Sequence, residues 1–336
     1  MSEVESEHAG RDYLVIGGAG FLALLARKEP HVAVYDLNNP PEGDALEGAT
    51  YFLGDILDES NLLDVLNKHS ITTVFHVVSP IHGLGRELYY RVNIEGTKSI
   101  LSACRKASTV TSLVFTSSTG CVWAGQTVSG ATEEELTYLT DDKFDVYGYT
   151  KGRAEETVLK ANGEDGVRTV AIRPCGMLGP RDNQGMWQIA AALESGQYVY
   201  KFGKEDVWSD MTYPTKSGPT RPTATRISGQ AFFVNNGEPI RYRHYPVTTW
   251  NLMGAEEKTV VIPLWVGWIM AKISELSFWF TGKRGPLTMY SYTVMTTDQY
   301  YSSEKAKKVL GWEPRWWNDR GAEQHAQKQK RKGKRD

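Results

Sequence analysis

Residues 15–23 read VIGGAGFLA, so an apolar run rich in β-branched residues enters a cluster of glycines and continues into a pattern of helical period. A strand that turns sharply into a helix requires glycine, because glycine tolerates positive φ and lets a ligand approach the backbone closely. The amino terminus of a helix that follows such a turn attracts phosphate groups. The stretch therefore predicts a dinucleotide-binding turn and, with it, a parallel α/β sheet.

Each small residue of this turn has an expected task. Gly17 permits the tight turn, Gly20 lets the backbone approach the pyrophosphate, and Ala23 allows close helix–strand packing. Asp36 ends the next predicted strand, where a carboxylate accepts hydrogen bonds from ribose hydroxyls and repels a 2′-phosphate, which favours NAD over NADP. An ordinary glycine turn with a solvated aspartate is the alternative. The expected cofactor contacts here are Gly17, Gly18, Gly20, Phe21, Leu22 and Asp36.

Beyond the turn, short apolar runs alternate with longer helical patterns up to about Pro180. This alternation is typical of parallel strands joined by crossover helices. The expected strands are Tyr13–Ile16, Val32–Tyr35, Thr73–Val78, Leu113–Thr116 and Thr169–Ile172, and the expected helices are Glu59–Lys68, Val92–Lys106 and Lys151–Ala161. The sequence thus predicts an α/β, doubly wound Rossmann sheet.

Residues 181–317 show weaker alternation and read as a smaller, irregular C-terminal substrate lobe, after an NAD-binding domain at 11–180. A strand at 230–234 is expected to join the large sheet. Helical patterns at 245–253, 264–280 and 303–310 are expected to build the lobe, and Pro214–Arg226 reads as a loop. The basic tail at 318–336 has few apolar residues to bury, so it is expected to be disordered.

Composition narrows the class of partner. The 38 basic and 40 acidic residues nearly cancel, so no overall field attracts nucleic acid, and a small-molecule substrate is expected. Three cysteines without CxxC spacing and a polar start predict a reducing, cytosol-facing compartment. Seven histidines form no ligand-like pair, so no metal site is predicted.

Tyr147 and Lys151 are four residues apart, hence on one face of a helix. An ammonium ion beside a phenol favours the phenolate, so Tyr147 is expected to act as a general base toward an alcohol, with Lys151 also holding the nicotinamide ribose. Ser118 follows the strand 113–116 at the carboxyl edge of the sheet and is expected to hydrogen-bond the substrate oxygen. Tyr149 is the rival tyrosine, but it faces away. A surface tyrosine with a solvated lysine is the alternative.

Taken together, the motifs resemble the extended short-chain dehydrogenases/reductases, within them the 3β-hydroxysteroid dehydrogenase family and most of all its decarboxylating sterol-4α-carboxylate 3-dehydrogenase branch. The resemblance covers about residues 11 to 317. It rests on GGAGFL at 17–22, Asp36, GDILD at 54–58, FHVVSP at 75–80, VNIEGT at 92–97, FTSST at 115–119, YGYTK at 147–151, RPCGMLGPRD at 173–182, FFVNNGEPI at 232–240 and YYSSEKAKKVLGWEP at 300–314.

This resemblance implies further contacts and a reaction. It implies that Asp55 and Ile56 border the adenine, that Pro174 lies beside the nicotinamide, and that the set Val77, Val78 and Ser79 flanks the ribose and nicotinamide. It also implies the roles given to Ser118, Tyr147 and Lys151. In such enzymes the 3β-alcohol of a sterol, steroid or related terpenoid becomes a ketone, and a 4α-carboxylate is then lost.

Two other functions remain open at this point. One is a reductase of flavonoid-type or aldehyde substrates, or a nucleotide-sugar epimerase, which would use the same cofactor and catalytic set. The other is a non-catalytic nucleotide-binding remnant. Fifteen residues between Gly20 and Asp36 leave a first crossover helix, Phe21–Lys28, of barely two turns, and Pro214–Arg226 stands where the family has a helix.

Residues 262–280 are rich in Trp, Ile and Phe, but Lys272 and Glu275 at the centre argue against a spanning helix. Two interpretations stay open: a helix in the membrane interface, with Trp265, Trp268, Ile269, Ile273, Leu276 and Trp279 exposed, or a core or pocket helix. The basic tail would add attraction to anionic lipids. Peripheral association with the endoplasmic reticulum membrane and a homodimer are both compatible with the sequence.

Overall fold

The computed structural model describes residues 12–17, 31–40, 43, 45, 47–81, 83–177, 185–212, 227–256, 258–281, 285 and 287–312. Several sequence-based expectations fall outside these residues. They are Gly18, Gly20, Phe21 and Leu22 of the glycine turn, the short helix at 21–28, the loop at 214–226 and the tail at 318–336.

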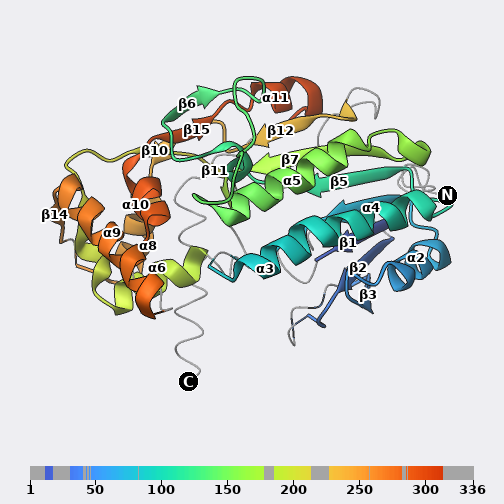
Figure 1. Ribbon diagram of the computed structural model, residues 1–336, viewed down its shortest axis with the longest axis horizontal. Helices are drawn as coiled ribbons and strands as arrows, with labels where there is room; N and C mark the ends of the chain where they lie inside the picture. The colour runs from blue at the N-terminus through green and yellow to red at the C-terminus, as the bar shows by residue number, and fades with distance from the viewer. Residues whose placement is uncertain are drawn as a thin grey trace.

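A seven-stranded parallel sheet forms the large layer of the molecule (Figure 1), in the order β12-β7-β5-β4-β1-β2-β3. The strands are β1 (Tyr13–Ile16), β2 (Val32–Asp36), β3 (Ala49–Leu53), β4 (Thr73–His76), β5 (Ser112–Thr116), β7 (Arg168–Pro174) and β12 (Ala231–Val234). The order reverses direction between β1 and β4, as in a dinucleotide-binding sheet. The predicted Rossmann-like α/β fold is therefore confirmed.

One face of this sheet carries the helices α2 (Glu59–Lys68), α4 (Thr97–Lys106) and α5 (Val146–Lys160) in a single layer (Figure 1). Leu62, Ile100 and Val158 of these helices are fully buried against the sheet. Such apolar burial is the main force that holds the helices on the strands. The predicted helix Glu59–Lys68 matches α2 residue for residue, and Asp58 caps it by accepting from the Asn61 N–H.

The predicted helix at 92–106 begins earlier and is not regular. It runs as α3 (Arg86–Tyr89), a π-helical segment η2 (Tyr90–Gly96) and α4 without a break. A π-helical turn inserts an extra residue per turn and commonly occurs at functional sites. The prediction missed residues 86–91, because Tyr89 is the only buried side chain among them and a single buried residue gives no hydrophobic period.

Strand β3 was not anticipated from the sequence. It pairs in parallel with β2 along five residues, yet every side chain in it is at least partly exposed because it forms the sheet edge. A strand without a buried face lacks the alternation that sequence analysis relies on. It nevertheless places Gly54 and Asp55 at the same edge of the sheet as Asp36, the last residue of β2.

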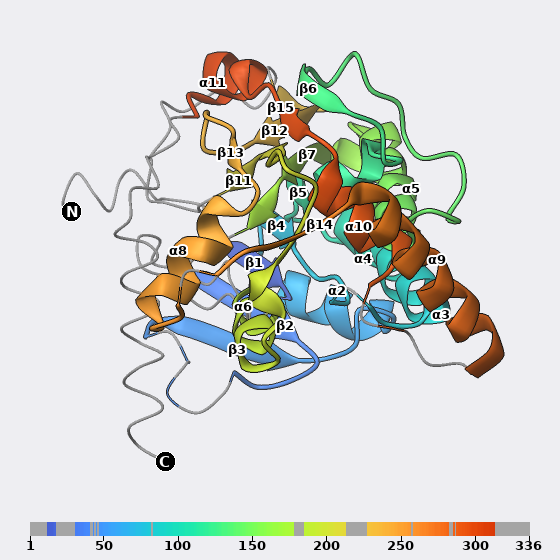
Figure 2. The same ribbon diagram turned by 90° about the vertical axis from the view of Figure 1, so that its left-hand side faces the viewer.

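A smaller lobe lies beyond the carboxyl ends of the large sheet (Figures 1 and 2). Its helices are α6 (Gly185–Glu194), α8 (His244–Leu252), α9 (Leu264–Thr281) and α10 (Met289–Thr296). A mixed four-stranded sheet joins the lobes; its strands are β13 (Ile240–Arg241), β10 (Trp208–Ser209), β15 (Gln299–Tyr301) and β6 (Val128–Ala131). Two smaller sheets consist of one strand pair each: β11 (Met211–Thr212) with β8 (Gly176–Met177), and β14 (Val260–Ile262) with β9 (Tyr200–Phe202). The short 3₁₀ segments are η3 (Thr119–Val122), η4 (Glu164–Gly166) and η5 (Gln197–Val199).

Helix α11 (Glu304–Leu310) was expected in the smaller lobe, but the structure places it elsewhere. Its Ala306 is fully buried against Val170, Phe232 and Val234 of β7 and β12. Thr169 of β7 points the opposite way, toward α5, where its hydroxyl donates to the Val158 carbonyl. Because neighbouring strand residues face opposite sides, α11 covers the face of the sheet away from α5.

Candidate active site

The predicted catalytic tyrosine lies in the first turn of α5, at the carboxyl edge of β5. Asp145 caps this helix, because its carboxylate accepts from the backbone N–H groups of Tyr147 at 3.0 Å and Gly148 at 2.9 Å. A side-chain cap of this kind satisfies the first amides of a helix and fixes where it starts. Asp145 is itself buried, and burial raises its pKa to about 6.

Ser118 and Tyr147 meet across the interface between β5 and α5. Ser118 lies two residues after β5, in extended backbone, and its Oγ accepts from the Gly120 N–H at 3.1 Å. Burial raises the pKa of the Tyr147 phenol, and a hydrogen bond with Ser118 acts in the opposite direction. The ring of Tyr89 stands edge-on to Tyr147, with 6.0 Å between ring centroids. The pair expected from the sequence is thus brought together.

Lys151 is buried one turn further along α5. Its Nζ donates to the Thr116 carbonyl at 2.5 Å and lies 4.2 Å from the centroid of the Phe115 ring. Desolvation lowers the pKa of Lys151 to about 7, and the nearby carboxylate of Glu155 opposes this. A lysine with only 2% exposure is a functional candidate, because a buried ammonium is otherwise costly.

Tyr149, the rival tyrosine, lies on another face of α5. Its ring is 6.2 Å from that of Tyr90 and 5.5 Å from the Arg153 guanidinium carbon. The geometry therefore favours Tyr147 as the partner of Ser118.

Gly148 explains how α5 approaches the segment after Ser118 so closely. A Cβ at this position would lie 2.3 Å from the Gly120 carbonyl oxygen and 2.7 Å from the Asp145 carboxylate. Only glycine fits here without displacing backbone. The glycine of the YGYTK motif is consequently required for the contact between helix and loop.

Asn93 links the segment after β4 to helix α5, and the sequence analysis gave it no role. Its Oδ1 accepts from the Ser79 hydroxyl at 3.0 Å, and its Nδ2 donates to the Thr150 Oγ at 3.0 Å. The Thr150 hydroxyl in turn lies within hydrogen-bond distance of the Val146 and Tyr147 carbonyls. Asn93 is buried in η2, so the π-helical turn holds it between the two segments. The signals in the sequence were a polar Asn within the predicted helix and its place in the motif VNIEGT at 92–97.

Gly17 is the one residue of the glycine turn that the structure describes. Gly17 adopts φ +84°, and a Cβ there would lie 2.7 Å from the Val78 Cα. The Val77 N–H donates to the Ile16 carbonyl at 3.0 Å, so β1 and the segment Val77–Ser79 remain side by side past the ends of their strands. Only a residue without a side chain fits at Gly17, which agrees with a turn that admits a dinucleotide.

Asp36 and the segment at 54–58 lie together at the carboxyl ends of β2 and β3. The Asp36 carbonyl accepts from the Gly54 N–H at 3.0 Å, and its carboxylate accepts from the Asn38 N–H at 3.2 Å. The Asp55 carboxylate accepts from the Leu57 N–H at 3.0 Å, while Ile56 is buried. These residues form one side of the expected adenosine site.

The Tyr35 side chain supports the segment at 54–58, a role that the sequence analysis did not predict. The fully buried phenol donates toward the Asp55 carbonyl at 3.1 Å and the Asn61 Oδ1 at 2.8 Å. Burial raises the pKa of Tyr35 to about 12, so the group stays a neutral donor.

Arg173 and Glu155 form a buried ion pair near Lys151, which the sequence analysis also did not predict. Arg173 Nη2 donates to Glu155 Oε1 at 2.6 Å, and the Tyr138 hydroxyl donates to the same oxygen at 2.7 Å. Arg173 belongs to β7 and Glu155 to α5, so the pair connects the strand that ends in Pro174 with the helix that carries Tyr147 and Lys151. Pro174 itself is buried at the end of β7, in register with Val234 of β12.

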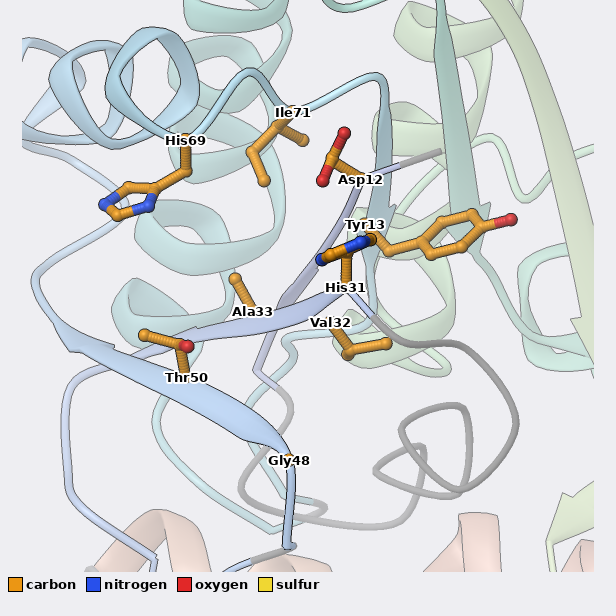
Figure 3. Close-up of a pocket in the computed structure, with 9 residues that line it drawn as sticks. All are labelled: Asp12, Tyr13, His31, Val32, Ala33, Gly48, Thr50, His69 and Ile71. Carbon is orange, nitrogen blue, oxygen red and sulfur yellow. The ribbon is translucent and has the colours of Figure 1, made fainter. Parts of the chain in front are cut away.

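A small hollow at the opposite edge of the sheet is separate from this site. Asp12, Tyr13, His31 and their neighbours line it at the amino-terminal ends of β1, β2 and β3 (Figure 3). Ligands of open α/β sheets bind at the carboxyl ends of the strands. The hollow therefore has no part in the catalytic arrangement.

Comparisons with known proteins agree with this geometry. Residues 14–264 match the model of the 3-beta hydroxysteroid dehydrogenase/isomerase family. The decarboxylating sterol-4-alpha-carboxylate 3-dehydrogenase ERG26 of Candida albicans is 33% identical, over 90% of this chain and 92% of its own length. The decarboxylating sterol-4-alpha-carboxylate 3-dehydrogenase of Mus musculus is 30% identical, over 93% of this chain and 89% of its own length.

Solved structures show the same fold at lower identity. UDP-glucose 4-epimerase of Thermotoga maritima superposes with a TM-score of 0.69 at 18% identity, covering 96% of this chain and 99% of the epimerase. The NAD complex of UDP-glucose 4-epimerase from Thermus thermophilus gives a TM-score of 0.67 at 21% identity, covering 94% and 98%. These similarities establish the fold alone.

Proposed function

We propose that this chain, which belongs to the 3-beta hydroxysteroid dehydrogenase/isomerase family of NAD(P)-dependent oxidoreductases, oxidises the 3β-hydroxyl of a sterol, steroid or related polycyclic terpenoid to a ketone. The observation that carries the proposal is the hydrogen-bonded pair of Ser118 and Tyr147 one helical turn from the buried Lys151. The three groups lie at the carboxyl edge of a dinucleotide-type sheet, where a substrate alcohol meets a nicotinamide.

The described residues fit NAD as the cofactor. The turn at Gly17 has no room for a side chain, and the acidic Asp36 ends β2, where a 2′-phosphate would be repelled. Asp55, Ile56, Val77, Val78, Ser79 and Pro174 complete the proposed binding site, with Gly18, Gly20, Phe21 and Leu22 of the turn. A bound oxidised dinucleotide supplies the acceptor for the hydride that leaves the alcohol carbon.

The protein groups then manage the proton of the alcohol. Ser118 hydrogen-bonds the substrate oxygen, and Tyr147 takes the hydroxyl proton as general base. The ammonium form of Lys151 favours the Tyr147 phenolate by charge and binds the nicotinamide ribose. Because Lys151 is buried against Thr116 and Phe115, its charge acts through a medium of low dielectric constant and is little screened by water.

The substrate class is inferred from the relatives. Those named above are sterol-4-alpha-carboxylate 3-dehydrogenases, and both align along about nine tenths of this chain. With a 4α-carboxysterol, oxidation at C3 produces a β-keto acid. Cleavage of the bond between C4 and the carboxylate then releases CO₂, because the electron pair is delocalised into the new carbonyl.

NADH formation with a panel of alcohols tests this function. The purified chain is incubated with NAD and a 4α-carboxysterol, a plain 3β-hydroxysteroid, UDP-glucose or a flavonoid-type alcohol, and absorbance at the NADH band is followed. We expect NADH with one or both steroids, and CO₂ release only with the first. Epimerisation forms no net NADH, so UDP-glucose is followed by chromatography of the sugar nucleotide. Turnover of only the sugar nucleotide or flavonoid would refute the proposal.

Calorimetry with NADH separates an inactive remnant from an enzyme whose substrate is missing from the panel. Binding at micromolar NADH supports a working cofactor site. Absence of binding at millimolar NADH would instead favour a non-catalytic protein.

A further inference from the structure

The buried ammonium group of Lys151 lies over the ring of Phe115. Its Nζ is 4.2 Å from the ring centroid, and its hydrogen bond to the Thr116 carbonyl, at 2.5 Å, is the single one that it makes with a described residue. Phe115 is fully buried on β5, on the face of the sheet that α5 covers. An ammonium ion over the face of an aromatic ring is attracted by the π-electrons, and the attraction is stronger where water is excluded.

Two other titratable groups near Lys151 contribute less than their position suggests. The Glu155 carboxylate, one turn further along α5, already forms an ion pair with Arg173 at 2.6 Å. Cys121 belongs to η3, and burial raises the pKa of its thiol to about 12, so the thiol carries no charge at neutral pH. The Phe115 ring therefore adds an attraction that these two groups do not provide.

His76 of β4 contacts the same ring, and its hydrogen bond identifies which nitrogen carries the proton. The His76 and Phe115 ring centroids are 5.0 Å apart, with 63° between the ring planes. The Thr97 hydroxyl donates to the Asn93 carbonyl at 2.5 Å. It therefore has no proton left for His76 Nε2, which lies 2.8 Å away, so Nε2 must be the donor.

The other nitrogen of His76 shows that this side chain is neutral. In the described part of the chain, nothing accepts a hydrogen bond from Nδ1, so a second proton there would be a buried donor without a partner. Burial and the charge of Lys151 lower the pKa of His76 well below its usual value. His76 consequently adds no second positive charge beside the ring that faces Lys151.

Desolvation brings the charged and neutral forms of Lys151 close to balance. It lowers the pKa of the side chain to about 7. Near neutral pH, a modest additional attraction therefore decides which form prevails. The ammonium form is the one that the proposed function requires, because its charge favours the Tyr147 phenolate.

We propose that Phe115 is a positioning residue, whose ring holds the Lys151 side chain over its face and stabilises it as an ammonium ion. The consequence for alcohol oxidation rests on the proposed function, whereas the contact itself needs neither substrate nor cofactor. A residue that only filled space at this position would pack on the stem of Lys151 without favouring its charge.

Fluorinated phenylalanines test the electrostatic part of this contact at nearly constant shape. Phe115 is replaced in the full chain by phenylalanine with one, two or three ring fluorines, because each fluorine withdraws π-electrons from the ring face. Lysine labelled with carbon-13 at Cε reports the side-chain pKa by NMR, and the variant K151M identifies the resonance of Lys151. Neither substrate nor cofactor is added.

Phe75 of the neighbouring strand β4 is the matched control. It points to the opposite side of the sheet from His76, and its ring is 6.0 Å from that of Tyr13. We expect the proton affinity of Lys151 to fall with each fluorine at position 115, by about tenfold with three fluorines. The same series at position 75 should change it by less than about 1.5-fold.

Two results would overturn the proposal. One is a pKa of Lys151 that stays constant along the series at position 115, which would leave Phe115 as a packing residue. The other is an equal fall along the series at position 75, which would reveal a general loosening of the sheet.

Kinetics separate this inference from the proposed function. If the chain oxidises a 3β-alcohol, kcat/KM should begin to fall at a lower pH in the fluorinated variants, in step with the pKa of Lys151, because the ammonium form is required. A falling pKa in a chain that oxidises no alcohol would refute the proposed function and support the role of Phe115. Oxidation with a constant pKa would do the reverse.

Discussion

Helices α5 and α9 both approach their neighbours through small residues, yet they present opposite kinds of side chain. On α5, Gly148 and Gly152 face the loop after β5, and Lys151 and Glu155 are buried beside them. On α9, Gly267 and Ala271 face the lobe. The large apolar side chains at 265, 269, 273 and 276 point outward.

The difference shows that small residues decide how close a helix comes, whereas the neighbouring side chains decide what the helix does. Close approach on α5 encloses Lys151, where desolvation lowers the pKa of the side chain and suits it to the proposed catalytic role. Close approach on α9 leaves its apolar face exposed in the part of the chain that the structure describes. The four predictions below test this contrast, from the largest expected effect to the smallest.

Tyr147→Phe is expected to lower kcat by about 10²- to 10⁴-fold, because it removes the proposed general base while keeping the ring that packs on Tyr89. Steady-state kinetics with an accepted 3β-alcohol would measure the loss. Tyr149→Phe is the matched control on the same helix, and it should retain most activity. Equal activity of the two variants would exclude Tyr147 as the base.

Arg173→Met is expected to destabilise the fold by about 3–5 kcal/mol, because it leaves the fully buried Glu155 carboxylate without its ionic partner. Lys272→Met on α9 breaks a half-exposed pair and should change the free energy of unfolding by less than about 1 kcal/mol. Urea unfolding compares them. The double variant R173M/E155M should regain much of the lost stability, and an effect of Arg173→Met as small as that of Lys272→Met would show that the buried pair contributes little.

Gly148→Ala is expected to cost about 1–3 kcal/mol of stability, because the added Cβ meets the backbone carbonyl of Gly120. At Gly267 the nearest atoms belong to the side chains of Phe202 and Tyr292, which can move, and alanine also favours helix by about 1 kcal/mol. Thermal unfolding should therefore show a clear loss for Gly148→Ala and a change within about 1 kcal/mol for Gly267→Ala. The reverse order would contradict the argument.

Lys151→Met is expected to raise stability near neutral pH by about 1 kcal/mol, because it removes a buried ammonium. The folded pKa of Lys151 is lowered from 10.5 to about 7, so between these values the unfolded chain binds more protons and the stability of the parent rises with pH. The advantage of the Met variant should be full below about pH 7 and fade toward pH 10. Unfolding curves at several pH values check this, and an advantage that grows with pH would contradict it.

Much of the nucleotide-binding half was predictable because its signals are local. The parallel strands, the helix at 59–68 and the set Ser118, Tyr147 and Lys151 all follow from periodicity and spacing along the chain. Edge strand β3 was not predictable, since partly exposed side chains leave no alternation to detect. Asn93, Tyr35 and the Glu155–Arg173 pair act through partners 14 to 57 residues away, which no local pattern reveals.

By itself, the sequence determined the fold class, the acidic end of β2 and the residues of the proposed catalytic set, because hydrophobic period, glycine and helical spacing act within a few residues. Only the tertiary structure decided that Lys151 is buried, that Asn93 connects Ser79 to Thr150, and that the apolar face of α9 points outward. Burial, pKa and the direction of a helix face depend on which distant segments pack together, and the apolar pattern of α9 reads the same whether that face is covered or exposed.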